Sequence, residues 1–197
     1  DPDQFHRLCD TLDGREYRLS ATNGSLFPQP LQSVHGCYSL GTDVVRFARQ
    51  DEDTLAVTFY EHYERNTLYV KRDGSLTDSR YGIREESHLV STRGMWMWDE
   101  DEICLTLFSS FTETPDTRII EMRMIGENME IIFDETPSAQ NAAAMLLELV
   151  GMMDEKTIKR LVPAMKHVPG FNENTLNDMV KKHTAPRAFG RMIHTHD

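Results

Sequence analysis

The chain of 197 residues has no uninterrupted apolar run near the roughly 20 residues that a membrane-spanning helix needs. Its longest apolar stretch, 142–153, is broken by Glu148 and Gly151. Positive charge is also scarce, since 21 Lys and Arg stand against 32 Asp and Glu, for a net charge of −11. The short apolar runs lead us to expect no membrane span. The negative field repels a phosphate backbone, so we expect no nucleic-acid partner.

Cysteine is rare as well, with Cys9, Cys37 and Cys104 alone. No Cys-x-x-Cys or paired Cys/His pattern occurs, so no zinc site is predicted. Two interpretations stay open: one disulfide plus one buried thiol in a secreted protein, or three reduced thiols in a cytosolic one. Cys9 with Cys37 is the preferred pair, because both lie outside the predicted strands.

Two features bear on localisation. The chain begins at Asp1 rather than Met, and Asn23 opens an Asn-Gly-Ser glycosylation sequon in what reads as a surface turn. We therefore expect a secreted protein or one in an organelle lumen; a soluble cytoplasmic protein is the alternative.

The motifs of common catalytic folds are missing. There is no nucleophile elbow, phosphate-binding loop, dinucleotide fingerprint or zinc-binding helix. The sequence identifies no cofactor and no metal site, and it leaves open whether the protein is an enzyme.

Short alternating segments separated by turn residues dominate the middle of the chain, 42–134. Connections this short join antiparallel neighbours, so they predict a β-meander. The expected strands are 44–49, 54–65, 67–72, 81–91, 94–99, 102–111, 118–125 and 129–133.

The pattern changes after Asp134. Thr136 and Pro137 resemble a helix N-cap and first turn, and Ala- and Leu-rich sequence follows, so 135–186 is predicted to form two or three helices. The segment 1–41 reads as irregular chain that joins the barrel, and 187–197 as a loose tail.

These elements predict a mainly β fold with C-terminal helices. A meander of about eight strands leaves exposed edges unless it closes, so we expect a barrel with the C-terminal helices packed on it.

The stretch "GMWMWDEDEICLTLF", residues 94–108, reads as a hairpin in which both faces are apolar. One interpretation is that one face fills the barrel and the other supports the C-terminal helices. The other is that Trp and Met side chains line an internal cavity, because an eight-stranded barrel has room for one small ligand.

Together with "MRMIGENMEIIF" and the looser "HGCYSLG" and "LDGREYRL", this hairpin resembles the calycin superfamily of lipocalins and fatty-acid-binding proteins. The resemblance covers about residues 38–133 and lies in the plan of strands. It implies a barrel that binds a small apolar molecule.

The candidate site residues form two sets. A ligand would contact large apolar side chains and one arginine, namely Phe59, Trp96, Trp98, Leu105, Met122, Met124 and Arg123. If the protein is an enzyme, the catalytic groups would be His62, Tyr60, Glu64 and His88, provided that they converge inside the barrel.

Three functions are weighed. The first is binding or transport of a small hydrophobic ligand in the barrel. The second is an isomerase, lyase or oxidative enzyme acting on an apolar small molecule in the same place. The third is an acidic interaction module that docks a protein partner through the C-terminal helices.

Overall fold

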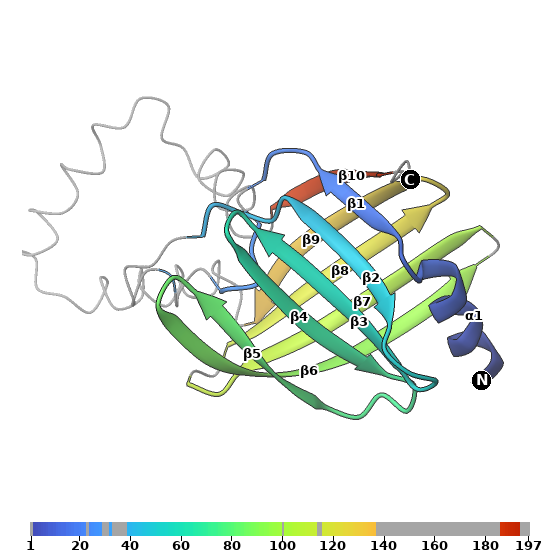
Figure 1. Ribbon diagram of the computed structural model, residues 1–197, viewed down its shortest axis with the longest axis horizontal. Helices are drawn as coiled ribbons and strands as arrows, with labels where there is room; N and C mark the ends of the chain where they lie inside the picture. Colours follow the sequence, from blue (N-terminus) through green and yellow to red (C-terminus); the bar gives the residue numbers. More distant parts are fainter. Residues whose placement is uncertain are drawn as a thin grey trace, which may run out of the picture.

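The computed structural model describes residues 2–22, 24–28, 32, 39–99, 101–113, 116–136 and 186–193. Ten antiparallel strands form one sheet in the order β4-β3-β2-β1-β10-β9-β8-β7-β6-β5. The sheet curls into a nearly closed barrel, in which the two edge strands, β4 and β5, lie side by side (Figure 1).

The elements have the following bounds: α1 Pro2–Leu12, β1 Glu16–Leu19, β2 Val44–Arg49, β3 Thr54–Glu61, β4 Glu64–Lys71, β5 Thr77–Ile83, β6 Glu86–Asp99, β7 Glu102–Phe111, β8 Thr117–Ile125, β9 Asn128–Thr136 and β10 Arg187–Met192.

Side chains close the barrel where backbone pairing stops, between β4 and β5. The amide of Asn66 on β4 binds the backbone of Gly82 on β5 twice: Nδ2 donates to the carbonyl at 3.0 Å, and Oδ1 accepts from the N–H at 2.7 Å. Farther along, the Thr77 hydroxyl donates to the Tyr69 carbonyl at 2.7 Å. These bonds satisfy part of the edge that the missing ladder leaves open.

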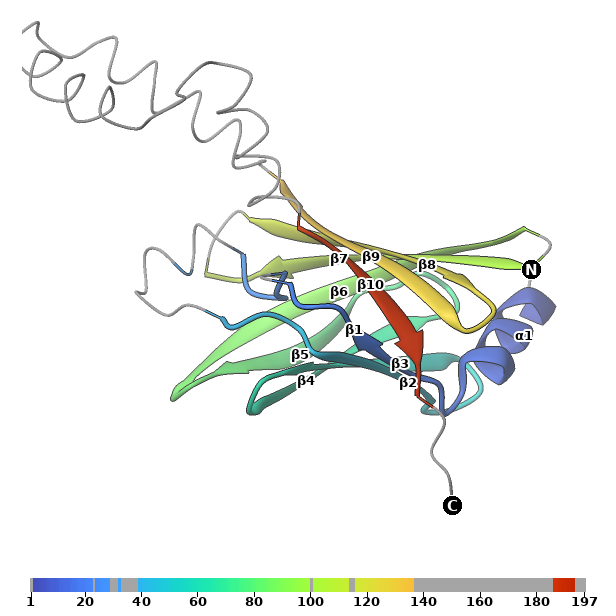
Figure 2. The same cartoon turned by 90° about the horizontal axis from the view of Figure 1, so that it is seen from above.

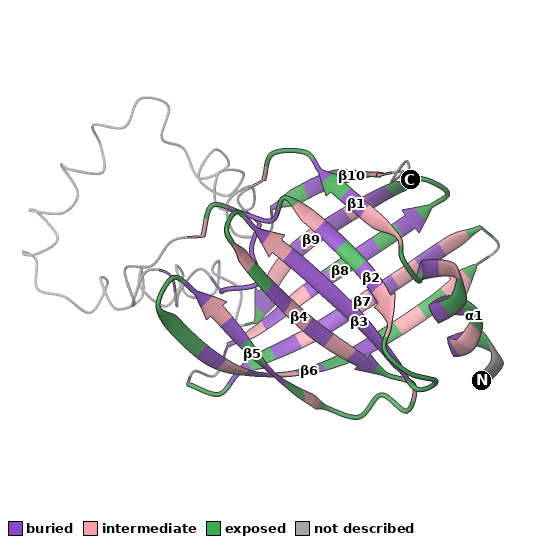
Figure 3. Cartoon of the chain, viewed as in Figure 1, coloured by how far each residue is buried: buried purple, intermediate pink, exposed green. Residues whose placement is uncertain are grey.

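Burial alternates along the strands, as a sheet with one wet face requires. On β7, for example, Ile103, Leu105 and Leu107 are buried, while the residues between them are partly exposed. Figure 3 shows the same alternation around the barrel. The inward side chains form one apolar core.

Helix α1 closes one end of the barrel (Figure 2). Its apolar residues Phe5, Leu8 and Leu12 recur at helical spacing and are fully buried. The ring of Phe5 lies 4.8 Å from that of Trp96. Trp96, on the inward face of the hairpin 94–108, therefore packs against the N-terminal helix.

The predicted fold class is wrong in its strand count and in its helices. The barrel has ten strands rather than about eight, because β1 and β10 insert between β2 and β9. The helix that packs on it, within the described residues, is the N-terminal α1. The helices predicted for 135–186 fall outside those residues, apart from the strand residues 135–136 and residue 186. The protein partner expected on these helices stays a prediction, as does the division into domains.

Three local predictions also differ from the structure. The expected tail contains β10, which pairs with β9 and β1. The predicted strand 54–65 is broken by a turn at His62, whose φ is +58°, and the predicted strands 81–91 and 94–99 give way to β5 and a single long β6. Alternation alone does not show a two-residue turn when its residues are as bulky as their neighbours.

The hairpin 94–108 turns Trp96 and Trp98 inward, half-buried, and Met95 and Met97 outward. Both Met side chains are about 60% exposed, so the prediction that the outer face of this hairpin is covered is wrong. Cys9 and Cys104 are free thiols, so Cys9 does not form the predicted pair with Cys37.

Candidate functional site at the polar end of the barrel

The barrel end opposite α1 holds the buried charged side chains Glu61, Arg118 and Glu135. Residues 24–28, here called the plug, enter this end as buried, irregular chain. Ser25 and Phe27 are fully buried. This placement overturns the expected surface turn, because the third residue of the glycosylation sequon lies inside the protein.

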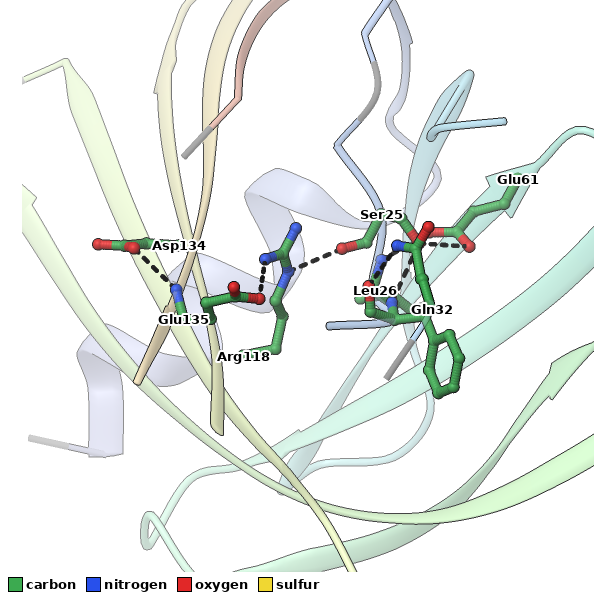
Figure 4. A network of polar contacts seen from close by, with 8 residues as sticks. Ser25, Leu26, Gln32, Glu61, Arg118, Asp134 and Glu135 are labelled. Atoms are coloured by element: carbon green, nitrogen blue, oxygen red, sulfur yellow. Dashed lines mark hydrogen bonds and ion pairs between the residues drawn. The ribbon is translucent and has the colours of Figure 1, made fainter. Parts of the chain in front are cut away.

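Glu61, the last residue of β3, is the acceptor at the centre of this end (Figure 4). It is 4% exposed. Five groups donate to its two oxygens: the Tyr81 hydroxyl at 2.6 Å, the Leu26 N–H at 2.7 Å, the Ser25 hydroxyl at 3.1 Å, the Thr42 hydroxyl at 3.2 Å and the Ser39 hydroxyl at 3.4 Å. A buried carboxyl group needs such partners, and the plug supplies two of the five.

Burial raises the pKa of the Glu61 carboxyl group above its ordinary value, and the hydrogen bonds from Tyr81, Leu26, Ser25 and Thr42 oppose that rise. Burial beside Glu61 likewise raises the pKa of the Tyr81 hydroxyl. The 2.6 Å hydrogen bond from the Tyr81 hydroxyl is the largest of the contacts that oppose the rise at Glu61.

Arg118 on β8 supplies a positive charge at this end of the barrel, and its side chain is fully buried. Its Nη1 donates to Glu135 Oε2 at 3.0 Å, and its Nε donates to the Ser25 carbonyl at 2.8 Å. Its guanidinium carbon lies 5.7 Å from the centre of the Phe133 ring. Burial lowers the pKa of Arg118, and the charge of Glu135 opposes that shift. Ser25 therefore joins Glu61 to Arg118.

An aromatic cluster surrounds the plug. The ring of Phe27 lies 5.4 Å from Tyr81 and nearly parallel to it, 4.8 Å from His88, and 5.5 Å from Phe111. Such spacings are those of favourable ring pairs. The plug therefore combines an apolar anchor with the two polar contacts of Ser25.

A pocket of about 150 Å³ opens beside this network. We call it the mouth pocket; it is lined by Ser39, Leu40, Glu61, His62, Tyr63, Glu64, Ile83 and Arg84. Leu40 and Tyr63 are 71% and 90% exposed, so apolar surface stands at the rim. Glu61 supplies a buried acceptor in the wall.

Two residues of this pocket hold a strained backbone. His62 and Arg84 have φ of +58° and +53°, each in the turn of a hairpin. They are the two non-glycine residues with positive φ in the described part of the chain. Such conformations cost about 1–3 kcal/mol and cluster at functional sites.

The structure brings together only part of the proposed catalytic set. His62 and Glu64 line the mouth pocket, whereas Tyr60 faces away from the interior and is half-buried. His88 points into the barrel, with Nε2 3.2 Å from Glu86 Oε2. An exposed His62 and a buried His88 do not share one interior site.

The proposed ligand-binding residues lie mostly in the core. Phe59, Leu105, Met122 and Met124 are buried in it, and Trp96 and Trp98 pack against its α1 end. Arg123 is on the outer face, where its Nη2 donates to Glu102 Oε2 at 2.9 Å. None of these residues lines the mouth pocket.

Sequence reasoning did not select Ser25, Glu61, Tyr81 or Glu135 as site residues. A signal for Glu61 exists: it continues the inward series of Val57 and Phe59 at period two. A charged residue in an apolar series is rarely buried without partners, so it marks an interior polar site. Ser25 carries no such signal, because it lies outside the strands.

A second pocket, of about 530 Å³, lies at the opposite ends of β3 and β4 and is lined by Asp51, Glu52, Asp53, Thr54, Lys71, Arg72 and Asp73. Within the described ranges, no group of three or more His, Cys, Asp or Glu is placed to hold a metal ion. No helix in that same part of the chain is long and apolar enough to cross a membrane.

Comparisons with family models, with curated proteins and with solved structures gave no match.

Proposed function

We propose that this protein binds a small, mainly apolar molecule in the mouth pocket. The observation that carries the proposal is the pocket itself: exposed Leu40 and Tyr63 at the rim, Ile83 in the wall, and a buried carboxyl group within reach. A cavity of about 150 Å³ accommodates a molecule the size of benzene.

A polar group on the ligand is also favoured. Glu61 accepts hydrogen bonds at the wall of the pocket, and His62, Glu64 and Arg84 lie around it. Ligand sites usually combine a mostly apolar lining with a few such groups, which fix the orientation of the ligand.

Membership of the calycin superfamily belongs to the same proposal. The nearly closed antiparallel barrel supports it, and a β-barrel can hold a ligand in this way. Transport of the bound molecule would follow if binding is reversible.

Two variants at matched exposure test the proposal. Leu40→Asp places a charge on the rim, whereas Leu76→Asp places one on a leucine that is 63% exposed and does not line the pocket. Calorimetric titration with small aliphatic alcohols and substituted benzenes should show binding to the wild type and to Leu76→Asp, with a loss of at least tenfold in affinity for Leu40→Asp. Equal affinities in all three proteins would contradict the site, and no binding to the wild type would contradict the function.

Catalysis on the bound molecule is the second candidate, favoured by the raised pKa of Glu61 in a pocket. Glu61 would act as general acid or base in an isomerase or lyase reaction on an apolar substrate, and His62 or Glu64 would assist from the rim. Incubation of the wild type and Glu61→Gln with each bound compound, followed by mass spectrometry, tests this. Conversion by the wild type alone would support the enzyme, and unchanged compounds would leave binding as the function.

A further inference from the structure

The plug occupies the interior in the manner of a bound ligand. Ser25, Leu26 and Phe27 are at most 2% exposed, although they belong to no helix or strand. Chain of this kind usually runs over the surface, because its backbone groups need hydrogen-bond partners. Here barrel side chains provide them: Glu61 accepts from the Leu26 N–H, and Arg118 donates to the Ser25 carbonyl.

Two of the buried charged side chains of the barrel wall bind this loop, and a third, Glu135 on β9, pairs with Arg118. Glu61 on β3 and Arg118 on β8 both bind Ser25, from opposite sides, through its hydroxyl and its carbonyl. The Nη2 atom of Arg118 is buried and makes no hydrogen bond to the described residues. Barrel walls that fold around apolar side chains alone need neither charge, and a buried charge is costly without a partner. Both charges are therefore placed as a ligand site would place them.

We propose that residues 24–28 fill an internal ligand site, and that the molecule bound through the mouth pocket displaces them. The contacts of the plug define the ligand class. It has an aromatic ring for the place of Phe27, among Tyr81, His88 and Phe111. It has an N–H or O–H donor for Glu61 and a carbonyl or carboxylate acceptor for Arg118. This inference rests on the proposed function, because the mouth pocket is the entrance.

The energetics follow from competition. A ligand that requires the plug to leave binds with an apparent affinity reduced by the fraction of molecules in the open state. A change that disfavours the seated plug should therefore tighten binding. A change that only weakens the barrel should not.

Two glycines give this comparison. A Cβ added at Gly24 would lie 2.2 Å from the Phe133 ring, so Gly24→Ala should unseat the plug. A Cβ added at Gly94 would lie 2.4 Å from Val70, in the barrel wall, so Gly94→Ala is a control of similar severity away from the plug. The probe is N-acetyl-phenylalaninamide, which carries the ring, the donor and the acceptor; toluene and N-acetyl-leucinamide each lack part of this set.

By calorimetric titration we expect the probe to bind Gly24→Ala at least tenfold more tightly than the wild type, and Gly94→Ala no more tightly than the wild type. Toluene and N-acetyl-leucinamide should bind Gly24→Ala at least tenfold more weakly than the probe does.

Hydrogen exchange on the wild type gives a second readout that needs no variant. The Leu26 N–H donates to Glu61, and the Phe27 N–H donates to the Ser25 hydroxyl at 3.0 Å, so both should exchange slowly in the free protein. Saturation with the probe should speed exchange of the peptide that contains them.

Equal affinity for the wild type and Gly24→Ala, with the plug still protected, would overturn the inference. If that binding is weakened by Leu40→Asp, the mouth pocket alone holds the ligand and the proposed function stands. No binding of the probe to any of the three proteins would also overturn the inference, whereas the proposed function is decided separately by the alcohol and benzene titrations.

Discussion

Replacement of the buried arginine offers the most direct test of how this barrel is stabilised. Arg118→Met keeps an apolar stem of similar length but removes the guanidinium from Glu135 and from the Ser25 carbonyl. The side chains of Arg118 and Glu135 are 0% and 1% exposed. Arg123→Met is the matched control, since Arg123 lies on the same strand and also binds a glutamate, but with its side chain 55% exposed.

The expected loss differs because water screens only one of the pairs. Breaking a buried pair from one side costs about 3–5 kcal/mol, since it leaves the other charge in the interior. At about 2–4 °C per kcal/mol for a chain of this size, the melting temperature should fall by about 6–20 °C. For Arg123→Met we expect a much smaller shift, because an exposed ion pair contributes little.

Urea denaturation of the two variants measures the free energy of unfolding and reports through the slope whether the unfolded state has changed. The double variant Arg118→Met/Glu135→Met should recover most of the loss, because apolar residues of similar volume remove both buried charges together. If Arg118→Met costs no more than Arg123→Met, burial does not determine the strength of this pair and the reasoning is refuted.

Three further outcomes are expected. Because burial raises the pKa of Glu61, the folded state holds its proton more tightly than the unfolded state; stability should therefore fall as the pH rises from the ordinary value of 4.5 to the folded-state pKa, and denaturation of Glu61→Gln across pH 4–8 should lack this fall. His62→Gly should stabilise the protein by about 0.5–1 kcal/mol, because relief of a left-handed φ exceeds the entropy cost of glycine, whereas Tyr63→Gly in the same turn should destabilise it in the same urea assay. Burial raises the pKa of the Cys9 thiol to about 11, so iodoacetamide at pH 8 should label Cys9 only in denaturant, as peptide mapping by mass spectrometry will show; rapid labelling of the native protein would contradict its burial.

Much of the sheet could be predicted from the sequence. The alternation in 102–111 matches β7 residue for residue, and 44–49 matches β2. The signal failed at Glu61, where the strand ends, because "EHYE" contains no glycine, asparagine or proline to mark the turn. It failed again at β10, because six residues near the end of the chain form a strand only when neighbours on both sides supply its hydrogen bonds.

The candidate site was predicted less well than the fold. The prediction that His62 and Glu64 are site residues rested on their side-chain chemistry and not on their position. Both do line the mouth pocket. Glu61, at its wall, is not among the predicted site residues; the turn at His62 brings Glu64 opposite Glu61 on the same face of the sheet. Which face of a strand points into the core depends on how the strand pairs with its neighbours, so the sequence of one strand alone does not determine it.

The sequence by itself determined the antiparallel sheet, the positions of most turns and the net charge of −11, since these depend on alternation, on local turn chemistry and on composition. Only the tertiary structure decided the rest: closure through β1 and β10, the capping of one end by α1, and the meeting of Ser25, Glu61 and Arg118 in the interior. The reason is physical. Partners separated by 93 residues, such as Arg118 and Ser25, share no local pattern, and they meet only because the barrel closes around them.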